Sequence, residues 1–302
     1  MSSSAPLRRR RRLPHLLLVP TVVLLLVGTG YPVVWQLVTS LREYGMAQQF
    51  GQPAPFVGLA NYAAILDDAA MWGVVVRSVV FAVVTAFVTL GVGILLALLM
   101  RAVWPWVRVT LQVSLLLAWA MPVVAAMTVW IWLFDRRRGV INWLLERLGL
   151  SGFHRFDWLA DPLTFFLLAG LVVVWMSVPF VALSVYAGLT QVSAEVVEAS
   201  QLDGASPAQR LRYILLPIIR PVVAIVLLLQ LVWDLRVFAQ VRLLQDAGSA
   251  SGRFDLLGTA IHKLGTGSGD FGMAAALSVV VLLLTVVLSA YYVRMLLKED
   301  ES

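Results

Sequence analysis

The sequence contains no cysteine, three histidines and only two lysines in 302 residues, and each scarcity excludes a class of chemistry. Without cysteine the chain has neither a disulfide framework nor a thiolate metal site. Leu follows Lys263 and Glu follows Lys298, so no G-x-x-x-x-G-K-[ST] phosphate loop occurs and the chain supplies no Walker-type ATP site. The histidines, His15, His154 and His262, lie at the edges of apolar runs or in connections, and no H-E-x-x-H occurs. We therefore expect no enzyme activity, cofactor or metal in this chain.

Charged residues are also scarce, at 13% of the chain, whereas hydrophobic residues make up 60% and the mean hydropathy is +0.87. A soluble domain is nearer ~45–50% apolar, so this composition indicates a chain embedded in a membrane. A helix needs ~20 residues to cross the ~30 Å hydrocarbon core. Five long runs contain no Asp, Glu, Lys or Arg, and a sixth is interrupted by Arg220, Asp234 and Arg236. We predict an all-α, polytopic membrane protein whose six transmembrane helices cover Leu16–Leu41, Ser78–Met100, Val109–Phe134, Pro162–Gln191, residues 215–240 and Phe271–Val293.

A cluster of arginines, Arg8–Arg12, precedes the first apolar run. It resembles the start of a signal peptide, but the apolar run is far longer than the usual ~7–15 residues and no A-x-A-like cleavage site follows. We interpret the run as an uncleaved first span with both termini of the chain in the cytoplasm. Counted with this cluster, the basic residues divide almost evenly between the two sides, and Arg136–Arg138 argues against this orientation, which therefore depends on the N-terminal cluster. The predicted organisation is a basic tail at 1–12, one transmembrane domain at 13–298 and a tail at 299–302.

The net charge is +6 and the isoelectric point is about 10.1. In a soluble protein such a charge would suggest a nucleic-acid partner. Here the basic residues flank apolar runs, where they lie against anionic lipid headgroups. We expect contact with membrane lipid and no binding of nucleic acid.

The connections on the outer side differ in their patterns. In the first, Asn61 precedes a short amphipathic segment and is predicted to cap it. Residues 135–161 contain "GVINWLLERLGLSG", whose apolar residues repeat at helical spacing, so we predict a short helix that ends at Gly149 or Gly152. Residues 241–270 are rich in Gly and Ser and are predicted to form a mobile loop.

A polar stretch, Ser193–Pro217, separates the fourth and fifth predicted spans. Ser193 is placed to N-cap a short helix, and Gly204 breaks that helix because glycine tolerates positive φ. Ser206, followed by proline and then by Gln209 three residues on, is the pattern of a capping box that starts a second helix. This second helix is predicted to end at Pro217, where the fifth span enters the bilayer.

The spacing of this stretch is specific: Glu198-Ala199-Ser200, three residues, Gly204, nine residues, Ile214, one residue, then Leu216-Pro217. It resembles the EAA loop of ABC importer permeases, E-A-A-x3-G-x9-I-x-L-P, with serine in place of the second alanine. The segments "FVGLANY", "GVINWLL", "WMSVPFVALSVYAGL" and "FGMAAALSVVVLLL" resemble carbohydrate permeases of the maltose-importer type. The chain departs from that family at Arg77-Ser78, where Asn-Thr is common, and at 245–249, where T-x-G-G-P is common. We expect these departures to affect the substrate and not the fold.

The resemblance implies the fold of a type I ABC importer permease and a set of partners. These are a second homologous permease subunit, two ATPase subunits that carry ATP and Mg²⁺, an extracytoplasmic substrate-binding protein and a carbohydrate substrate. The EAA loop would dock on an ATPase and pass its closure to the spans. The alternative is a solvated loop whose caps only order the chain. The residues that the resemblance assigns to ATPase coupling are Glu198, Ala199, Ser200, Asp203, Gly204, Ile214, Leu216 and Pro217.

The polar residues of the fifth predicted span are candidates for the substrate pathway. Charged side chains are costly inside a membrane and usually face a cavity or mark a path. Asp234 has Gln230 one helical turn before it, and Trp233 offers a flat ring on which a sugar can stack. The alternative is that Asp234 and Arg236 lie at the outer interface or pair across a subunit boundary. The resemblance implies pathway contacts from the middle of this span and from the W-x-x-x-P-F segment, which here means Gln230, Trp233, Asp234, Val237, Met176, Ser177 and Phe180.

The sequence therefore predicts a permease subunit of an ATP-driven sugar importer in a bacterial plasma membrane. An importer of glycerol 3-phosphate is the alternative within transport, because basic outer connections would suit an anion. A stand-alone channel or secondary carrier would leave the cytoplasmic two-helix loop without a purpose. A membrane scaffold or receptor is disfavoured by the polar residues of the fifth span.

Overall fold

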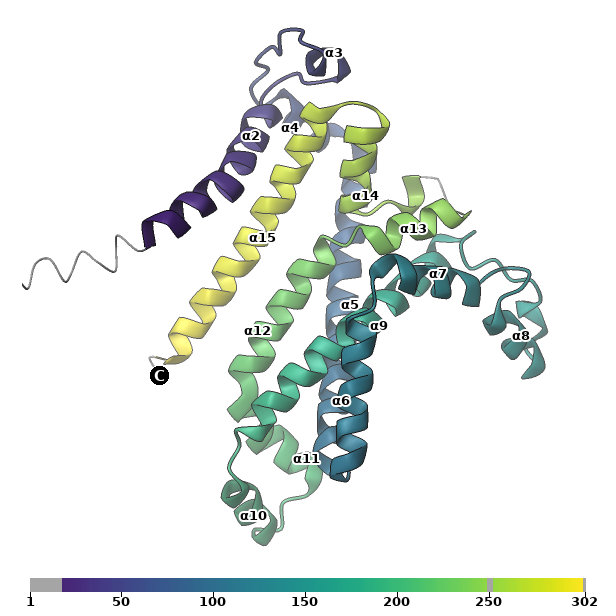
Figure 1. The fold of residues 1–302 in the computed structure, drawn as a ribbon, viewed down its shortest axis with the longest axis vertical. Helices are drawn as coiled ribbons and strands as arrows, with labels where there is room; N and C mark the ends of the chain where they lie inside the picture. The colour runs from purple at the N-terminus through teal and green to yellow at the C-terminus, as the bar shows by residue number, and fades with distance from the viewer. Residues whose placement is uncertain (1–17, 249–251, 301–302) are drawn as a thin grey trace, which may run out of the picture. The chain divides into compact units, whose positions relative to one another are not determined.

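The computed structural model describes residues 18–248 and 252–300 (Figure 1). The arginine cluster at 8–12 and the last two residues of the predicted C-terminal tail lie outside these residues. The described chain is built from helices, and its one isolated β-bridge joins Arg42 to Phe56. The predicted all-α fold is confirmed.

The described residues form two compact units. The first comprises residues 18–69 and Ile261–Val280. It begins with a continuous helix, Leu18–Ser40, that includes a π-helical turn. This helix contains η1 (Leu26–Gly30) and α2 (Tyr31–Ser40), and the further elements are α3 (Met46–Gln49), α4 (Ala60–Asp67), η5 (Lys263–Gly267) and the start of α15 (Phe271–Asp300).

Asn61 does not cap α4 as predicted, since the N-cap position is occupied by Leu59. Its side-chain amide instead donates to the carbonyl oxygens of Ser40 and Arg42, at 2.9 and 3.0 Å. The last carbonyls of a helix have no partner within the helix. Asn61 supplies partners at the end of α2, and the hydroxyl of Tyr62 adds a 2.7 Å hydrogen bond to Ser40 Oγ.

The second unit comprises Ala70–Ala260 and the chain from Val281 onward. It contains the longest helices and all of the candidate functional residues. Its elements are α5 (Ala69–Ala102), α6 (Pro105–Trp119), α7 (Val123–Leu133), α8 (Val140–Arg147), η2 (Ser151–Phe153), α9 (Pro162–Thr190), α10 (Ala194–Leu202), α11 (Pro207–Arg210), η3 (Leu211–Leu215), α12 (Leu216–Leu235), α13 (Ala239–Gly248), η4 (Gly252–Phe254), α14 (Leu257–His262) and the end of α15.

The third predicted span is broken. The predicted helix over Val109–Phe134 is two helices, α6 and α7, bent by 97°. Pro122 stands between them, lacks a backbone N–H and disfavours helical conformation for Met121 before it. Five described helices are long and apolar enough to cross a membrane, and the number is six if the bent pair forms one span.

The fifth span begins earlier than predicted. The second short helix does not end at Pro217, because the chain continues from α11 through the π-helical turn η3 into α12. Within that turn the N–H of Leu216 bonds to the carbonyl of Leu211, five residues back. The wider turn relieves the clash that proline causes in an α-helix, so the loop and the span form one continuous helical rod.

The predicted mobile loop at 241–270 is wrong for the described residues, 241–248 and 252–270. Most of this segment is helical, in α13, η4, α14 and η5. The side chains of Val241, Leu244 and Leu257 are fully buried at 0% exposure. Apolar residues at helical spacing therefore outweigh the Gly and Ser content, because burying each one stabilises the segment by about 1.5–3 kcal/mol.

Helices α5, α9 and α12 share one hydrophobic core of the second unit, and α5 approaches α9 closely at Gly93. A Cβ atom added to Gly93 would lie 2.5 Å from Val181 Cγ1, so only glycine permits this approach. Ala97 and Ala182 are fully buried nearby, a pattern of small residues that lets membrane helices pack closely. A second hydrophobic cluster, around Phe165, joins α9 to α13 and η4.

Arg77 and Ser78, where the chain departs from the family pattern, tie α5 to the segment before α14. The hydroxyl of Ser78 accepts a 2.8 Å hydrogen bond from the N–H of Leu257. Arg77 donates to the carbonyls of Gly252 and Asp255, at 3.2 and 3.4 Å. The departure thus has a structural role at this end of the helix.

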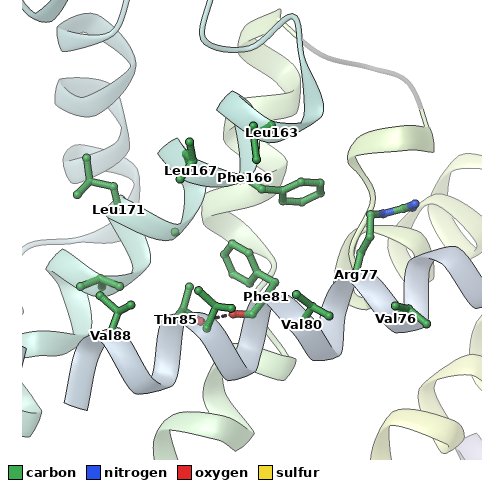
Figure 2. Close-up of a pocket in the computed structure, with 13 residues that line it drawn as sticks. Val76, Arg77, Val80, Phe81, Thr85, Val88, Leu163, Phe166, Leu167 and Leu171 are labelled. Carbon is green, nitrogen blue, oxygen red and sulfur yellow. Dashed lines mark hydrogen bonds between the residues drawn. The ribbon is translucent and has the colours of Figure 1, made fainter. Parts of the chain in front are cut away.

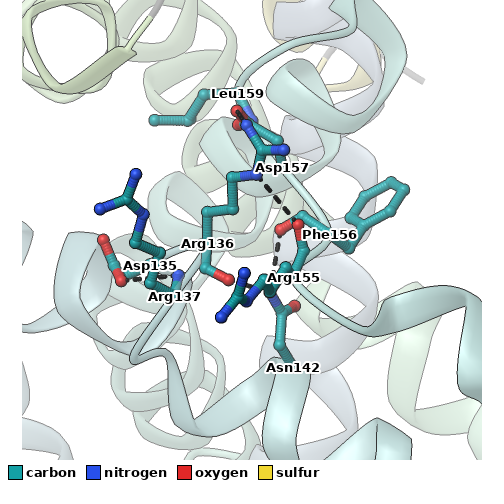
Figure 3. A network of polar contacts seen from close by, with 8 residues as sticks. All are labelled: Asp135, Arg136, Arg137, Asn142, Arg155, Phe156, Asp157 and Leu159. Atoms are coloured by element: carbon teal, nitrogen blue, oxygen red, sulfur yellow. Dashed lines mark hydrogen bonds and ion pairs between the residues drawn. The ribbon is translucent and has the colours of Figure 1, made fainter.

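Helix α8 ends at Arg147, and Gly149, one of the two glycines predicted to end it, follows with φ +90°. The helix is fixed by Asn142, which is buried and accepts a 2.7 Å hydrogen bond from Trp158 Nε1. The side-chain amide of Asn142 also donates to the carbonyl of Phe156 (Figure 3). The turn before α8 is closed by Asp135. Backbone N–H groups of Arg138 and Arg137 donate to its carboxylate and lower its pKa.

Candidate functional site

The polar stretch Ser193–Pro217 lies at one end of the second unit. Figure 1 shows α10 and α11 at the end of this unit opposite α13. Two short helices joined at a glycine were predicted here, and both are present. We call this segment, Ser193–Pro217, the coupling loop.

The first joint is the end of α10. Gly204 has φ +79°, a left-handed conformation that favours glycine. The N–H groups of Gly204 and Ala205 return to the carbonyls of Gln201 and Ser200, both at 3.0 Å. This pair of hydrogen bonds is a Schellman motif, which closes a helix and fixes the direction of the chain that follows.

The second joint is the start of α11. Ser206 Oγ accepts a hydrogen bond from the N–H of Gln209 at 3.3 Å, and Gln209 Oε1 accepts one from the N–H of Ser206 at 2.8 Å. The predicted capping box is therefore formed, with Pro207 in the first turn. Ser193, by contrast, occupies the N-cap position of α10 without a side-chain hydrogen bond.

The surface of the coupling loop is polar with a few large apolar side chains. Glu198, Ala199 and Asp203 are exposed, and Leu202 is 90% exposed. The angle between the two helices leaves a notch of about 310 Å³. The notch is lined by Asp203, Gly204, Ala205, Gln209, Tyr213 and Ile214.

The other assigned residues of the loop face inward or continue the helix. Ser200 is buried, and its hydroxyl donates to the carbonyl of Val197 at 2.6 Å, which explains why serine fits in place of alanine. Leu216 is half-buried and Pro217 is exposed in the rod that leads into α12. The exposed residues of the motif are thus accessible to a partner, whereas Ser200 packs within the chain.

A polar cluster lies inside the second unit, between α5 and α12. Asp234 is 3% exposed. Its two carboxylate oxygens accept from Thr85 Oγ1 at 2.8 Å and from Gln230 Nε2 at 2.7 Å. Gln230 Oε1 and Thr89 Oγ1 are buried without a hydrogen-bond partner among the described residues. These two oxygen atoms can therefore each accept a further hydrogen bond in apolar surroundings.

Trp233, also on α12, belongs to an aromatic group. The ring of Trp233, 46% exposed, lies 5.1 Å from that of Phe180, which is in turn 6.2 Å from Trp119. Phe180 comes from α9, so three helices contribute to this aromatic group. Trp233 precedes Asp234 in the chain, and its ring is exposed whereas the carboxylate is buried.

The remaining predicted pathway residues are less accessible. Val237 is buried in the cluster around Phe165, just after α12 ends. Met176 and Ser177 are half-buried on α9, and Met176 Sδ accepts from Gln240 Nε2 at 3.6 Å. Arg236 is exposed at the C-cap of α12 and lies outside the polar cluster.

Sequence reasoning missed Thr85 and Trp119. Thr85 stands 149 positions from Asp234, in a run of uncharged residues that gives no sign of a polar partner. Trp119 lies in the last turn of α6, and its contact with Phe180 comes from the packing of α6 against α9. Only the spacing Thr85–Thr89, one helical turn, marks a polar stripe on α5.

Comparison with known proteins identifies the class of this chain. Residues 89–295 match the family described as "Binding-protein-dependent transport system inner membrane component". The match covers more than half of the chain, and the chain belongs to this family.

Two curated relatives and one solved structure show the same relationship. The diacetylchitobiose uptake system permease protein DasB of Streptomyces coelicolor is 36% identical, over 95% of this chain and 88% of its own. The sn-glycerol-3-phosphate transport system permease protein UgpA of Salmonella typhi is 30% identical, over 97% of each. A chain of a bacterial ABC transporter involved in alginate import shares the fold, with a TM-score of 0.81 and 21% identity over 95% of this chain and 96% of its own.

These matches confirm the assignment made from the EAA-like spacing. The chain is a multi-pass membrane protein, the permease subunit of a binding-protein-dependent ABC importer.

Proposed function

We propose that this chain lines half of the path by which a neutral oligosaccharide crosses a bacterial plasma membrane. The observation that supports it is the group formed by Asp234, Gln230 and the Trp233–Phe180 ring pair. Carboxylate and amide groups match sugar hydroxyls, which donate and accept, and an indole face matches the apolar face of a sugar ring. The relative named for diacetylchitobiose uptake supports the same substrate class.

A phosphate ester fits this group less well. The relative named for glycerol 3-phosphate transport keeps that alternative open. An anion, however, would meet the carboxylate of Asp234, and Arg236 lies outside the cluster. The charge at the centre of the proposed pathway therefore favours a neutral sugar.

The burial of Asp234 is consistent with alternating access. A transporter must cover its pathway in one state and expose it in another. In this structure Asp234 and Gln230 are covered, while Trp233 remains accessible. We assign Trp233, Phe180 and the half-buried Met176 and Ser177 to the accessible edge of the pathway, and Val237 to its support.

The coupling loop connects this transport to ATP hydrolysis on partner subunits. We assign its exposed face, with Glu198 and Asp203, to a cleft on a cytoplasmic ATPase subunit that binds ATP and Mg²⁺. The complex then contains a second homologous permease, two ATPase subunits and an extracytoplasmic binding protein, and this chain is non-catalytic. Since the loop faces the ATPases, it lies in the cytoplasm, and six spans place both termini on the same side.

The test is sugar uptake by the complete importer in vesicles. Trp233→Ala is expected to lower uptake of a neutral disaccharide about tenfold, because stacking on an aromatic face contributes about 1–2 kcal/mol. Basal ATP hydrolysis should stay unchanged. Trp143→Ala, which removes a 56% exposed indole from the outer helix α8, is the matched control. Uptake of glycerol 3-phosphate in place of sugar by the unaltered importer would refute the proposed substrate.

A further inference from the structure

A groove runs along the face of the second unit between α5 and α9. Its volume is about 550 Å³, within the range of small-molecule sites. The lining side chains are apolar apart from Arg77 and Thr85, and Thr85 directs its hydroxyl to Asp234. Figure 2 shows the apolar rows of the two helices facing each other, with Arg77 at one end. The rows are Val80, Val84 and Val88 on α5, and Leu163, Leu167 and Leu171 on α9.

The groove lies within one leaflet of the bilayer. The run Ser78–Met100 has no charged residue, and its length as a helix is about 34 Å, close to the ~30 Å hydrocarbon core. Arg77 therefore lies at the boundary between hydrocarbon and headgroups. From Val76 to Val88 the groove is about 18 Å long, which is roughly the thickness of one leaflet. This leaflet is the one away from the coupling loop.

Arg77 has a guanidinium that is fixed but not neutralised. Its two hydrogen bonds go to the backbone carbonyls of Gly252 and Asp255. No ion pair joins it to a carboxylate in the part of the chain that the structure describes, and Asp255 Oδ1 accepts from Gln245 instead. A guanidinium at headgroup depth is a phosphate ligand because its planar donors match two phosphate oxygens.

We infer that this groove binds one anionic phospholipid, with its phosphate at Arg77 and one acyl chain along the valine and leucine rows. Charge complementarity selects the occupant, since a neutral helix would leave the guanidinium without an anion. An uncharged or zwitterionic lipid would lie along the valine and leucine rows but would neutralise the charge of Arg77 less completely. The side chains of Val84 and Leu167 are 55% and 59% exposed, so the groove is open to such a chain.

The test measures retained lipid on the complete importer purified in detergent. After incubation with phosphatidylglycerol in mixed micelles, native mass spectrometry is expected to show one phosphatidylglycerol for each copy of this chain. Arg77→Gln should reduce this retention about fivefold or more. Val84→Trp should do the same by filling the groove, and it leaves the contacts of Arg77 with the 252–255 segment intact.

Two matched variants control for charge and bulk. Arg253→Gln removes a neighbouring exposed arginine, and Val83→Trp adds an indole to a 41% exposed position of α5 outside the groove. Both should retain the lipid. Unchanged retention in Arg77→Gln and Val84→Trp, or equal retention of phosphatidylcholine, would overturn the inference.

A protein occupant gives a different result. Val84 can be replaced by benzoylphenylalanine, whose light-activated ketone inserts into nearby C–H bonds and needs no ionised group. We expect illumination of the intact importer to attach this side chain to phospholipid. Attachment to the second permease subunit instead would show that a helix, and not a lipid, fills the groove.

Discussion

Replacing Gly204 by valine is expected to abolish coupled transport while leaving the membrane domain folded. A Cβ at this position meets nothing within 4 Å, so the effect comes from the backbone alone. A β-branched residue at φ +79° is strained by about 1–2 kcal/mol, and the strain is relieved by opening the Schellman turn. The angle between α10 and α11 then changes, and with it the notch beside Asp203. Uptake should fall at least ~30-fold, and the binding protein should no longer stimulate ATP hydrolysis.

The matched control for this change is Gly149→Val. Gly149 has φ +90° at the end of α8, so the substitution imposes the same backbone strain away from the coupling loop. It should leave stimulation of ATP hydrolysis intact. Glu198→Lys gives an independent check, because it reverses an exposed charge without straining the backbone. Normal uptake in both loop variants would remove the coupling role from this segment.

Asp234→Ala is the second change with a large expected effect. It leaves the hydroxyl of Thr85 and the amide of Gln230 buried without their shared acceptor. Each buried donor without a partner lowers the free energy of unfolding by about 1–3 kcal/mol. We expect sugar uptake to fall at least tenfold while assembly and basal ATP hydrolysis stay near normal.

Asp234→Asn separates the two roles of the side chain. It keeps a hydrogen-bonding group of the same shape and removes the charge, so partial rescue would assign the effect to hydrogen bonding. Asp246→Ala is the control, because Asp246 forms an exposed ion pair with Arg242 and such pairs contribute little. Unchanged uptake kinetics in Asp234→Ala would exclude Asp234 from the pathway.

The sequence predicts the coupling loop well because its signals are local. The capping box at Ser206 and the glycine turn at Gly204 each depend on residues within a few positions. Their hydrogen bonds form within the segment itself, so spacing is sufficient to locate them. The same holds for Gly149, which follows the end of α8.

The polar cluster is not predictable in this way. Gln230 and Asp234 are visible as one helical turn, but Thr85 reaches them from 149 positions away, and packing alone decides that contact. Similarly, Pro217 is a poor guide to the end of a helix because a π-helical turn accommodates it. Local rules fail where tertiary contacts compensate for a local penalty.

Two further segments show that local composition can also mislead. Pro122 is a local signal for the break in the third span, but the apolar residues on both sides suggest one continuous helix. In the 241–270 segment, Gly and Ser suggest a loop, while Val241 and Leu244 are buried in the core. In both cases average composition hides the few positions that decide the structure.

The central claim, that an ATPase subunit docks on the coupling loop, is tested most directly by asking whether the ATPase covers this loop. Leu202→Cys places the only thiol of the chain at a 90% exposed position of this loop. Its reaction with a water-soluble maleimide is measured in inverted membrane vesicles, with Leu148→Cys, at a 70% exposed position of the outer segment, as the control. We predict that the Leu202→Cys thiol reacts when the permeases are present alone and is protected when the ATPase subunits are assembled. Equal labelling with and without the ATPase subunits would contradict the account.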